Sequence, residues 1–304
     1  FLSDISSSNL IGIITVLSLL VFKLVPLFNK LSYSINTVSN SYVFSSMLNE
    51  IYSELKNTYI DKKLYKKNNK NSKKWNKIYL KNVSYKYPNS ENYSISDINI
   101  EIEKGLHYGF VGFSGAGKST TIDICNGLLY PTKGNVFIDK KDIKDFGVRE
   151  WQSKIGYVPQ QPKLFESTIR ANIAFGIEDS LIDEGKVIEC LKLVGLKETI
   201  NNLPNGINTL VGESGKLFSG GQKQLMAIAR SLYKEPEIII MDEATNSLDA
   251  ISEEKLRRVL KGLHGKIALL TIAHNFSNII HSDHIFLFSK GKLIDQGSPN
   301  FLYD

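Results

Sequence analysis

The chain has 304 residues, of which 42% are hydrophobic and 22% charged, a composition typical of a globular protein with a substantial apolar core. The formal net charge is +6. Its two cysteines, Cys125 and Cys190, fall in stretches with a helical pattern, so the sequence supports neither a disulfide framework nor a cysteine zinc site. We expect both to be reduced, buried thiols.

The sequence begins at Phe1 rather than at a methionine, so we expect a piece or a processed product of a longer chain. The stretch Leu10–Phe28 is apolar apart from Thr15, Ser18 and Lys23. As a helix, it would rise about 28 Å, close to the thickness of a bilayer core. The run is too long for a signal peptide. We interpret it as a transmembrane helix, the alternative being a buried helix of a soluble protein.

The next two segments lie between this helix and the rest of the chain. From Asn29 to Lys56 apolar residues recur every three to four positions, which predicts an extension of the membrane helix, so residues 1–56 form one unit. Residues 57–77 contain eight lysines and a single acidic residue, Asp61, and we interpret them as a linker. Lysines beside a membrane place that end of the helix in the cytoplasm, at an inner or plasma membrane.

The remainder of the chain is close to neutral, because the linker carries the excess positive charge. A nucleic-acid-binding domain would spread basic residues across a folded face. We therefore expect the lipid bilayer, and no nucleic acid, as a partner.

Residues 78–304 have the pattern of an α/β domain. The apolar runs at 238–241 and 267–272 predict buried parallel strands. The strands at 78–85 and 95–102 are expected to form an antiparallel layer, and those at 285–288 and 293–295 a closing hairpin. Residues 139–154 are expected to form polar turns, and about 161–235 a helical subdomain interrupted by glycines. The predicted strands are Ile78–Tyr85, Ile95–Ile102, Tyr108–Val111, Val136–Ile138, Ile155–Val158, Ile238–Met241, Ile267–Ile272, Ile285–Phe288 and Leu293–Asp295.

A glycine-rich loop, Gly-Phe-Ser-Gly-Ala-Gly-Lys-Ser at 112–119, lies between a predicted strand and a helical pattern at Thr120–Leu129. Glycines let successive backbone N–H groups face phosphate oxygens, and the helix N-terminus favours the same anion. In such a loop Lys118 reaches the β- and γ-phosphates and the Ser119 hydroxyl binds Mg²⁺. The predicted nucleotide-binding residues here are Gly112, Ser114, Gly115, Ala116, Gly117, Lys118, Ser119 and Thr120.

Two acidic residues follow the apolar strand Ile238–Met241. Ligands of α/β sheets bind at the carboxyl ends of such strands. We predict that Asp242 binds the Mg²⁺ held by Ser119 and that Glu243 polarises a water for attack on the γ-phosphate. The alternative, a chance acidic loop, is disfavoured by the phosphate loop upstream.

The stretch Phe218-Ser219-Gly220-Gly221-Gln222 precedes a helical pattern at Lys223–Tyr233. Two glycines and a hydroxyl at a helix start predict a second anion site. Since one nucleotide needs one phosphate cradle, a second cradle indicates a partner.

Together these motifs resemble the nucleotide-binding domain of ABC transporters: the loop at 112–119, FSGGQ at 218–222, IIIMDE at 238–243, Asn246–Asp249, and His274 after a strand. Their order and spacing match throughout residues 78–304, and GTPases and kinases lack the second cradle. The resemblance implies a P-loop NTPase fold with a RecA-like core, an antiparallel β layer and a helical subdomain. It also implies ATP and Mg²⁺ as cofactors.

The resemblance assigns roles to four further residues. Tyr87 matches the aromatic residue that stacks on adenine, with ordinary core packing as the alternative. Gln160 matches the loop glutamine that touches Mg²⁺ and moves with the membrane domain, with a plain turn as the alternative. Asp249 matches the aspartate loop across a dimer interface, and His274 resembles the switch histidine that contacts the γ-phosphate.

In such proteins two copies sandwich two ATP molecules, each between one copy's 112–119 loop and the other's Ser219–Gly221. We therefore expect a second nucleotide-binding domain, in a homodimer, as partner.

Two features resemble the exporter branch of the family: the membrane helix ahead of the ATPase domain, and Val211–Gly215, which is similar to an exporter cross-talk segment. Residues 24–55 look like the last membrane helix of lipid-linked oligosaccharide flippases and lipid A exporters. The implied function is ATP-driven export or flipping of a lipid-linked glycan or lipid by a half-transporter. A peptide or drug exporter, a DNA-maintenance ATPase of the same family and an ATP-binding regulatory module remain open alternatives.

Overall fold

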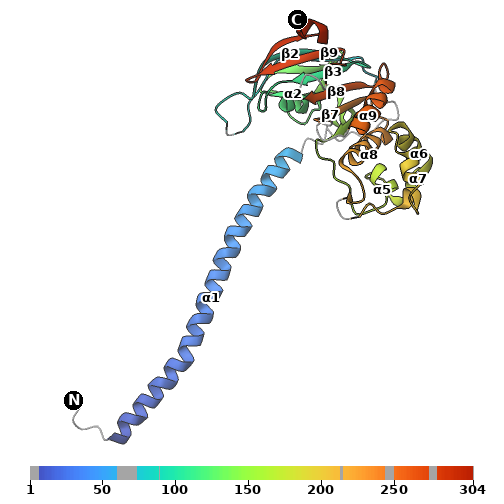
Figure 1. The fold of residues 1–304 in the computed structure, drawn as a ribbon. Coiled ribbons are helices and arrows are strands. Elements are labelled where there is room, and N and C mark those ends of the chain that lie inside the picture. The colour runs from blue at the N-terminus through green and yellow to red at the C-terminus, as the bar shows by residue number, and fades with distance from the viewer. Residues whose placement is uncertain are drawn as a thin grey trace. The chain divides into compact units, whose positions relative to one another are not determined.

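The computed structural model describes residues 7–59, 74–88, 90–212, 215–243, 250–273 and 279–303. The chain divides into two compact units, Phe1–Tyr65 and Lys66–Asp304. Helix α1 (Ser7–Tyr59) makes up the described part of the first unit, so the two predicted helical segments form one continuous helix (Figure 1). Its stretch Ile11–Ser53 is long and apolar enough to cross a membrane, and its side chains are exposed.

The second unit contains the predicted antiparallel layer. In it β1 pairs with β2 on one side, with Ile78 opposite Ile102, and with β4 on the other. The side chains of these strands alternate between buried and exposed positions, as expected for a sheet covered on one face. The strands are β1 (Lys77–Tyr85), β2 (Ile95–Glu103), β4 (Lys133–Ile138) and β5 (Lys141–Asp142), in the order β2-β1-β4-β5.

A second, six-stranded sheet forms the centre of the unit. Neighbouring strands run parallel except at the edge, where β9 and β10 form the predicted hairpin. Its strands, in the order β10-β9-β3-β8-β7-β6, are β3 (His107–Val111), β6 (Ile155–Val158), β7 (Ile238–Asp242), β8 (Ala268–Ala273), β9 (His284–Ser289) and β10 (Lys292–Gly297).

The alternation of side chains along the central strands creates two cores. On β7, Ile238 and Ile240 belong to the core shared with α2 (Lys118–Cys125) and the antiparallel layer, whereas Ile239 and Met241 belong to the core shared with the helices. Because both faces of the sheet are covered at its centre, the inner strands β3, β7 and β8 are buried along almost their whole length, whereas the edge strand β10 is largely exposed. The prediction of a RecA-like core with an antiparallel β layer is confirmed.

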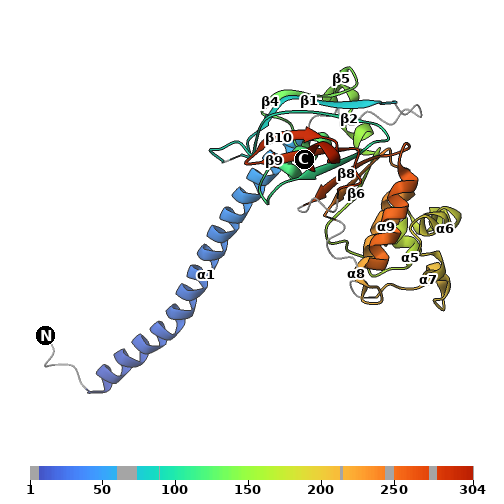
Figure 2. The same ribbon diagram turned by 45° about the horizontal axis from the view of Figure 1, so that its top comes forward.

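The helical part gathers on the other face of the sheet, away from the antiparallel layer (Figure 2). The predicted interruptions are present, since Gly176, Gly206, Gly212 and Gly215 all have positive φ. The helices are α5 (Ile169–Ile173), α6 (Glu184–Leu193), α7 (Lys197–Asn201), α8 (Gly220–Tyr233) and α9 (Ala250–Leu263), with short 3-10 turns η2 (Asp179–Leu181) and η3 (Gly206–Asn208), while α10 (Pro299–Tyr303) follows β10.

Two sequence predictions of local structure were wrong. The helix after the glycine-rich loop ends at Cys125 instead of Leu129, because Gly127 adopts a φ of 67° and the N–H groups of Leu128 and Leu129 both return to the Asp123 carbonyl. The region expected to hold polar turns contains α3 (Ile143–Phe146) and α4 (Val148–Gln152).

Trp75, which the sequence analysis places in the linker, is buried in the core of the folded unit. Its ring packs edge-on against the buried Trp151 of α4, with 5.4 Å between ring centroids. Cys125 and Cys190 are both buried free thiols, as predicted.

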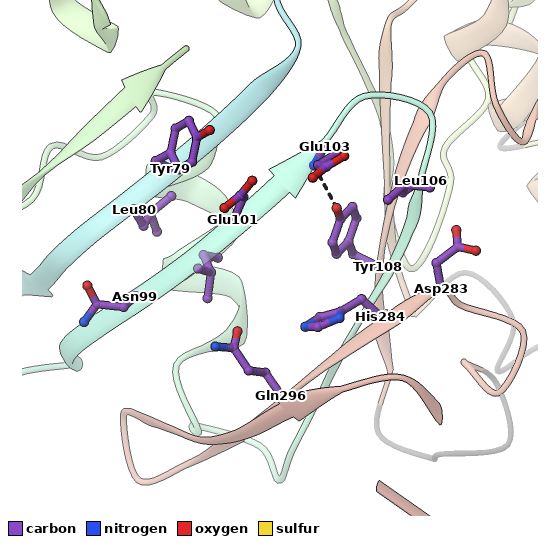
Figure 3. Close-up of a pocket in the computed structure, with 11 residues that line it drawn as sticks. Tyr79, Leu80, Asn99, Glu101, Glu103, Leu106, Tyr108, Asp283, His284 and Gln296 are labelled. Carbon is purple, nitrogen blue, oxygen red and sulfur yellow. Dashed lines mark hydrogen bonds between the residues drawn. The ribbon is translucent and has the colours of Figure 1, made fainter. Parts of the chain in front are cut away.

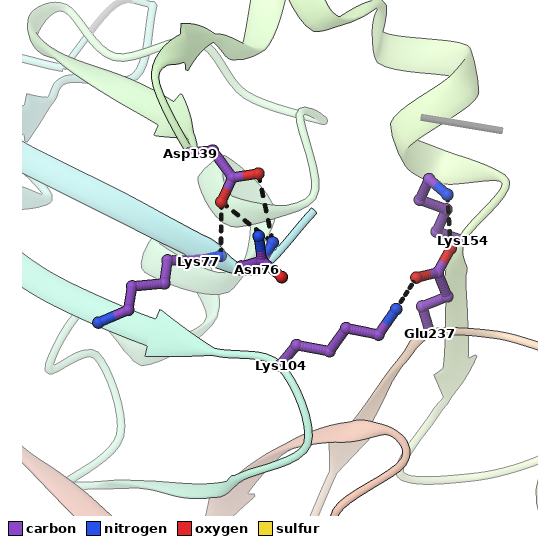
Figure 4. A network of polar contacts seen from close by, with 6 residues as sticks. All are labelled: Asn76, Lys77, Lys104, Asp139, Lys154 and Glu237. Carbon is purple, nitrogen blue, oxygen red and sulfur yellow. Dashed lines mark hydrogen bonds and ion pairs between the residues drawn. The ribbon is translucent and has the colours of Figure 1, made fainter. Parts of the chain in front are cut away.

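A polar network ties the edge of the antiparallel layer to the central sheet (Figure 4). Glu237, just before β7, accepts hydrogen bonds from Lys104 and from the buried Lys154, the latter over 2.5 Å. Nearby, the Asp139 carboxylate accepts from the backbone N–H groups of Asn76 and Lys77. The contacts of Glu237 lie at the start of β7, and the candidate site lies at the opposite end of this strand.

Candidate nucleotide-binding site

The glycine-rich loop connects β3 to α2, as predicted. Its glycines are required for two different reasons. Gly117 has a φ of 101°, and a Cβ there would lie 2.5 Å from Ile95 Cγ2, so close packing excludes a side chain. Gly115 has a φ of 75° with nothing within 4 Å of a built Cβ, so its left-handed turn opens the backbone to a ligand.

Lys118 is buried, with 5% of its surface exposed, and its ammonium donates to the carbonyls of Gly112 over 2.6 Å and Phe113 over 3.0 Å. The ammonium is therefore held inside the curve of the loop. Burial lowers the pKa of Lys118, and the carboxylates of Glu243 and Asp242 act in the opposite direction. A desolvated ammonium at the mouth of a backbone N–H cradle is suited to bind phosphate.

The two predicted carboxylates lie at the end of β7, which is separated from β3 only by β8. Asp242 accepts a hydrogen bond from the Tyr157 hydroxyl, with 2.9 Å between the oxygens. Glu243 accepts from the side-chain amide of Gln160 over 2.6 Å. Val111, the last residue of β3, lies opposite Ala273 on β8, and Asp242 lies opposite the adjacent Ile272, so the phosphate loop and the two carboxylates follow the same edge of the sheet. The bond between Gln160 and Glu243 adds the loop after β6 to this edge.

The predicted base-stacking residue lies beside the loop. Tyr87 is 42% exposed, and its ring meets that of Tyr85 edge-on at 4.9 Å between centroids. Its hydroxyl lies 3.3 Å from Thr120 Oγ1, which also approaches the hydroxyl of Ser94 at 3.2 Å. One edge of the Tyr87 ring is thereby fixed to the first turn of α2, while the ring keeps an accessible surface.

The second predicted cradle is the start of α8. Ser219 caps this helix: its hydroxyl accepts from the Gln222 N–H over 3.2 Å, and its own N–H donates to the Gln222 side chain over 2.9 Å. Because the hydroxyl acts as an acceptor here, its proton stays available for an anion. The N–H groups of Gly220 and Gly221 belong to the first turn, where helices leave donors unpaired.

The two cradles belong to different cores. The phosphate loop and α2 pack between the two sheets, through Ala116 and Ile122, whereas Phe218 and α8 pack with the helical part.

Two predicted site residues, Asp249 and His274, lie outside the described residues. The rest of the predicted segment Asn246–Asp249 also lies outside them.

One side chain at the carboxylates was not predicted from the sequence: Tyr157, on β6, bonds Asp242 as described. The position of Tyr157 in the sequence was a usable signal, because it lies three residues before Gln160, on strand β6, which pairs with the strand that ends in Asp242. The fully buried Gln224, on α8, was also not predicted, and it donates to the carbonyl of Pro159, the residue before Gln160, over 3.3 Å.

The donor set fits a nucleotide-bound Mg²⁺. Among the described residues no group of three or more histidine, cysteine or carboxylate side chains could enclose a metal ion. Mg²⁺ is usually bound through one or two protein groups, waters and the phosphates of the substrate, as opposed to an all-protein cage. Ser119, which is exposed beside Lys118, and Asp242 are suited to supply such groups.

A separate groove of about 700 Å³ lies between β1, β2, β9 and the start of β3, lined in part by Glu101, Glu103, Tyr108 and His284 (Figure 3). The phosphate loop follows the opposite end of β3. Lys77 pairs with Glu101 and Glu103, each over 2.6 Å, and the Tyr108 hydroxyl accepts from the Glu103 N–H. Because its carboxylates are paired and it lies at the far end of β3, we assign no nucleotide to this groove.

Comparison with known proteins agrees with this geometry. A family model described as ABC transporter matches residues 95–246. The chain is 38% identical over 229 residues to "Multidrug resistance protein 4" of Entamoeba histolytica, covering 75% of this chain and 18% of that protein. It is 41% identical over 221 residues to the "ATP-dependent lipid A-core flippase" of Coxiella burnetii, covering 73% of this chain and 37% of that one.

A solved structure is also similar: a bacterial Atm1-family ABC exporter with ATP bound matches with a TM-score of 0.69 and 34% sequence identity. The match covers 75% of this chain and 39% of that chain. The chain thus spans well under half the length of the proteins it matches.

Proposed function

The chain belongs to the ABC transporter family, and we propose that it is the C-terminal part of an exporter half-transporter driven by ATP hydrolysis. The observation that carries the proposal is that the phosphate loop with its buried Lys118 follows β3 at the same edge of the sheet at which Asp242 and Glu243 follow β7. A cationic phosphate cradle facing two carboxylates is the arrangement that metal-assisted phosphoryl transfer to water requires.

In this proposal the loop N–H groups and Lys118 bind the phosphates, Tyr87 stacks on the base, and Ser119, Asp242 and Gln160 hold Mg²⁺. The metal supplies charge neutralisation at the β- and γ-phosphates. Glu243 orients the attacking water and accepts its proton, and the Gln160 amide, which bonds Glu243, fixes the direction of the carboxylate.

A second copy completes the site. The cradle at Ser219–Gly221 belongs to a different core from the phosphate loop, so we assign it to the nucleotide held by a partner domain. Each ATP would lie between one copy's 112–119 loop and the other copy's α8, joined by Asp249 at the interface and by His274 at the γ-phosphate.

We further propose that α1 spans the membrane and that the ATPase domain lies in the cytoplasm. The exposed apolar surface from Ile11 to Ser53 supports a lipid environment. As the exported substrate we propose a lipid-linked glycan or lipid. A relative named as a lipid A-core flippase supports this choice, and relatives named as multidrug resistance proteins make a drug the alternative.

Mg²⁺-dependent ATP hydrolysis by the purified chain in detergent tests the ATPase part. We expect Lys118→Ala to abolish ATP binding and Lys192→Ala, at an exposed position of α6, to leave it intact; equal binding by both would contradict the site. Sequencing the coding DNA upstream of Phe1 tests the transporter part. Further apolar spans in frame would support it, and a start codon immediately before Phe1 would contradict it.

A further inference from the structure

Strand β6 and the loop after it supply one hydrogen-bond donor to each of the two carboxylates. β6 runs parallel to β7, with Tyr157 opposite Ile240. Gln160 is already part of the proposed site through its bond to Glu243. Tyr157 has the corresponding relationship to Asp242, with its hydroxyl 2.9 Å from Oδ2.

The direction of this hydrogen bond is fixed by chemistry. A tyrosine hydroxyl has an ordinary pKa of about 10, and an ionised carboxylate can only accept a hydrogen bond. The hydroxyl therefore keeps its proton at neutral pH and donates, while the carboxylate accepts. Half of the Tyr157 surface is exposed, and the residue belongs to neither of the two buried cores. Its contact with Asp242 is therefore not a by-product of core packing.

We propose that Tyr157 is a positioning residue for Asp242: it holds one carboxylate oxygen and thereby sets the rotation of the group toward the cation. The inference rests on the proposed function of Asp242 in Mg²⁺ binding. A carboxylate rotates easily about its last side-chain bond, so a single fixed donor restricts that rotation. Partners of metal-binding carboxylates commonly act in this way.

The test measures metal affinity directly. Mn²⁺ replaces Mg²⁺ in the presence of a non-hydrolysable ATP analogue, and the free Mn²⁺ signal in electron paramagnetic resonance gives the dissociation constant. We expect Tyr157→Phe, which removes only the hydroxyl, to weaken Mn²⁺ binding about tenfold. Affinity for the analogue in EDTA should be unchanged. Tyr79→Phe is the matched control, since Tyr79 lines the groove at the far end of β3.

A second background separates positioning from a general disturbance. In Asp242→Asn the proposed metal group is already changed, so adding Tyr157→Phe should have no further effect on Mn²⁺ binding. An unchanged dissociation constant in Tyr157→Phe would overturn the inference. So would a tenfold loss that persists in the Asp242→Asn background. Wild-type chain that binds no Mn²⁺ with the analogue would instead contradict the proposed function itself.

Discussion

The side-chain amide of Gln160 lies 2.6 Å from the carboxylate of Glu243, and this hydrogen bond joins the loop after β6 to the residue after β7. Glu243 has a φ of 47°, a left-handed conformation that is uncommon for a residue other than glycine. Backbone strain of this kind gathers at functional sites, where the surroundings hold it in place. A displacement of the Gln160 loop therefore changes the surroundings of the proposed general base.

Removal of that base should separate binding from hydrolysis. In Glu243→Gln the side chain keeps its size but loses the ability to accept a proton, so we expect phosphate release to fall by at least about a hundredfold. ATP binding should persist and trap a stable dimer, visible by size-exclusion chromatography. Glu235→Gln is the control, because Glu235 shares the positive φ but pairs with Lys186 away from the site. Unchanged turnover in Glu243→Gln would rule out its assigned role.

The Tyr87 ring should contribute to ATP affinity through its face. We expect Tyr87→Ala to weaken ATP binding about tenfold, within the range of base–aromatic stacking. Tyr87→Phe keeps the ring and loses only the contact with Thr120, so its affinity should stay close to wild type. Fluorescence titration with a labelled ATP analogue measures both. Equal losses in the two variants would assign the effect to the hydroxyl and contradict stacking.

Ser219 has a structural and a functional role that two variants can distinguish. Ser219→Ala removes the N-cap of α8, which should lower the free energy of unfolding by about 1 kcal/mol. The Thr168 hydroxyl caps α5 in the same way, because it accepts a hydrogen bond from the Ala171 N–H over 3.2 Å, and Thr168→Ala removes this cap. We expect similar stability losses but a drop in ATPase rate only for Ser219→Ala. A comparable rate loss in both would make Ser219 a purely structural cap.

The Glu237 network should make stability depend on pH. Burial acts to raise the pKa of Glu237, but the hydrogen bonds from Lys104 and Lys154 outweigh it and the pKa is lowered from 4.5. The contribution to stability is thus fully present above 4.5 and is lost as the pH falls through the lower folded-state pKa.

We therefore expect Glu237→Gln to lower the free energy of unfolding by about 2 kcal/mol at pH 7, since it leaves the buried Lys154 without its carboxylate. The difference from wild type should shrink below pH 4. Urea unfolding at several pH values measures it, with Glu103→Gln, on an exposed pair with Lys77, as the control. A pH-independent difference would contradict the ionic account.

Much of the fold could be predicted because local sequence and tertiary structure agree. The run Ile238–Met241 is apolar throughout because both of its faces are buried. The loop at 112–119 was predictable because the glycines that its turns require lie within the loop itself. The end of α2 was missed because Leu128 and Leu129 continue the apolar pattern although Leu128 is largely exposed. Trp75 packs against Trp151, a contact between distant segments that periodicity does not encode.

The same limit applies to the site. Lys118, Asp242 and Glu243 belong to motifs whose spacing is readable along the chain. The bond between Tyr157 and Asp242 depends on β6 lying beside β7 in one register, which only the folded sheet establishes. The groups proposed to touch the nucleotide, and Gln160 beside Glu243, could thus be named from the sequence, whereas Tyr157 beside Asp242 could not.

The central claim is that two copies of the domain form each hydrolytic site, and the specific ATPase rate as a function of protein concentration tests it most directly. The chain is diluted in detergent at saturating Mg²⁺ and ATP, and phosphate release is divided by protein concentration. The account predicts that this specific rate rises with concentration at the dilute end and levels off once dimers dominate. A specific rate that stays constant down to the most dilute sample would contradict it.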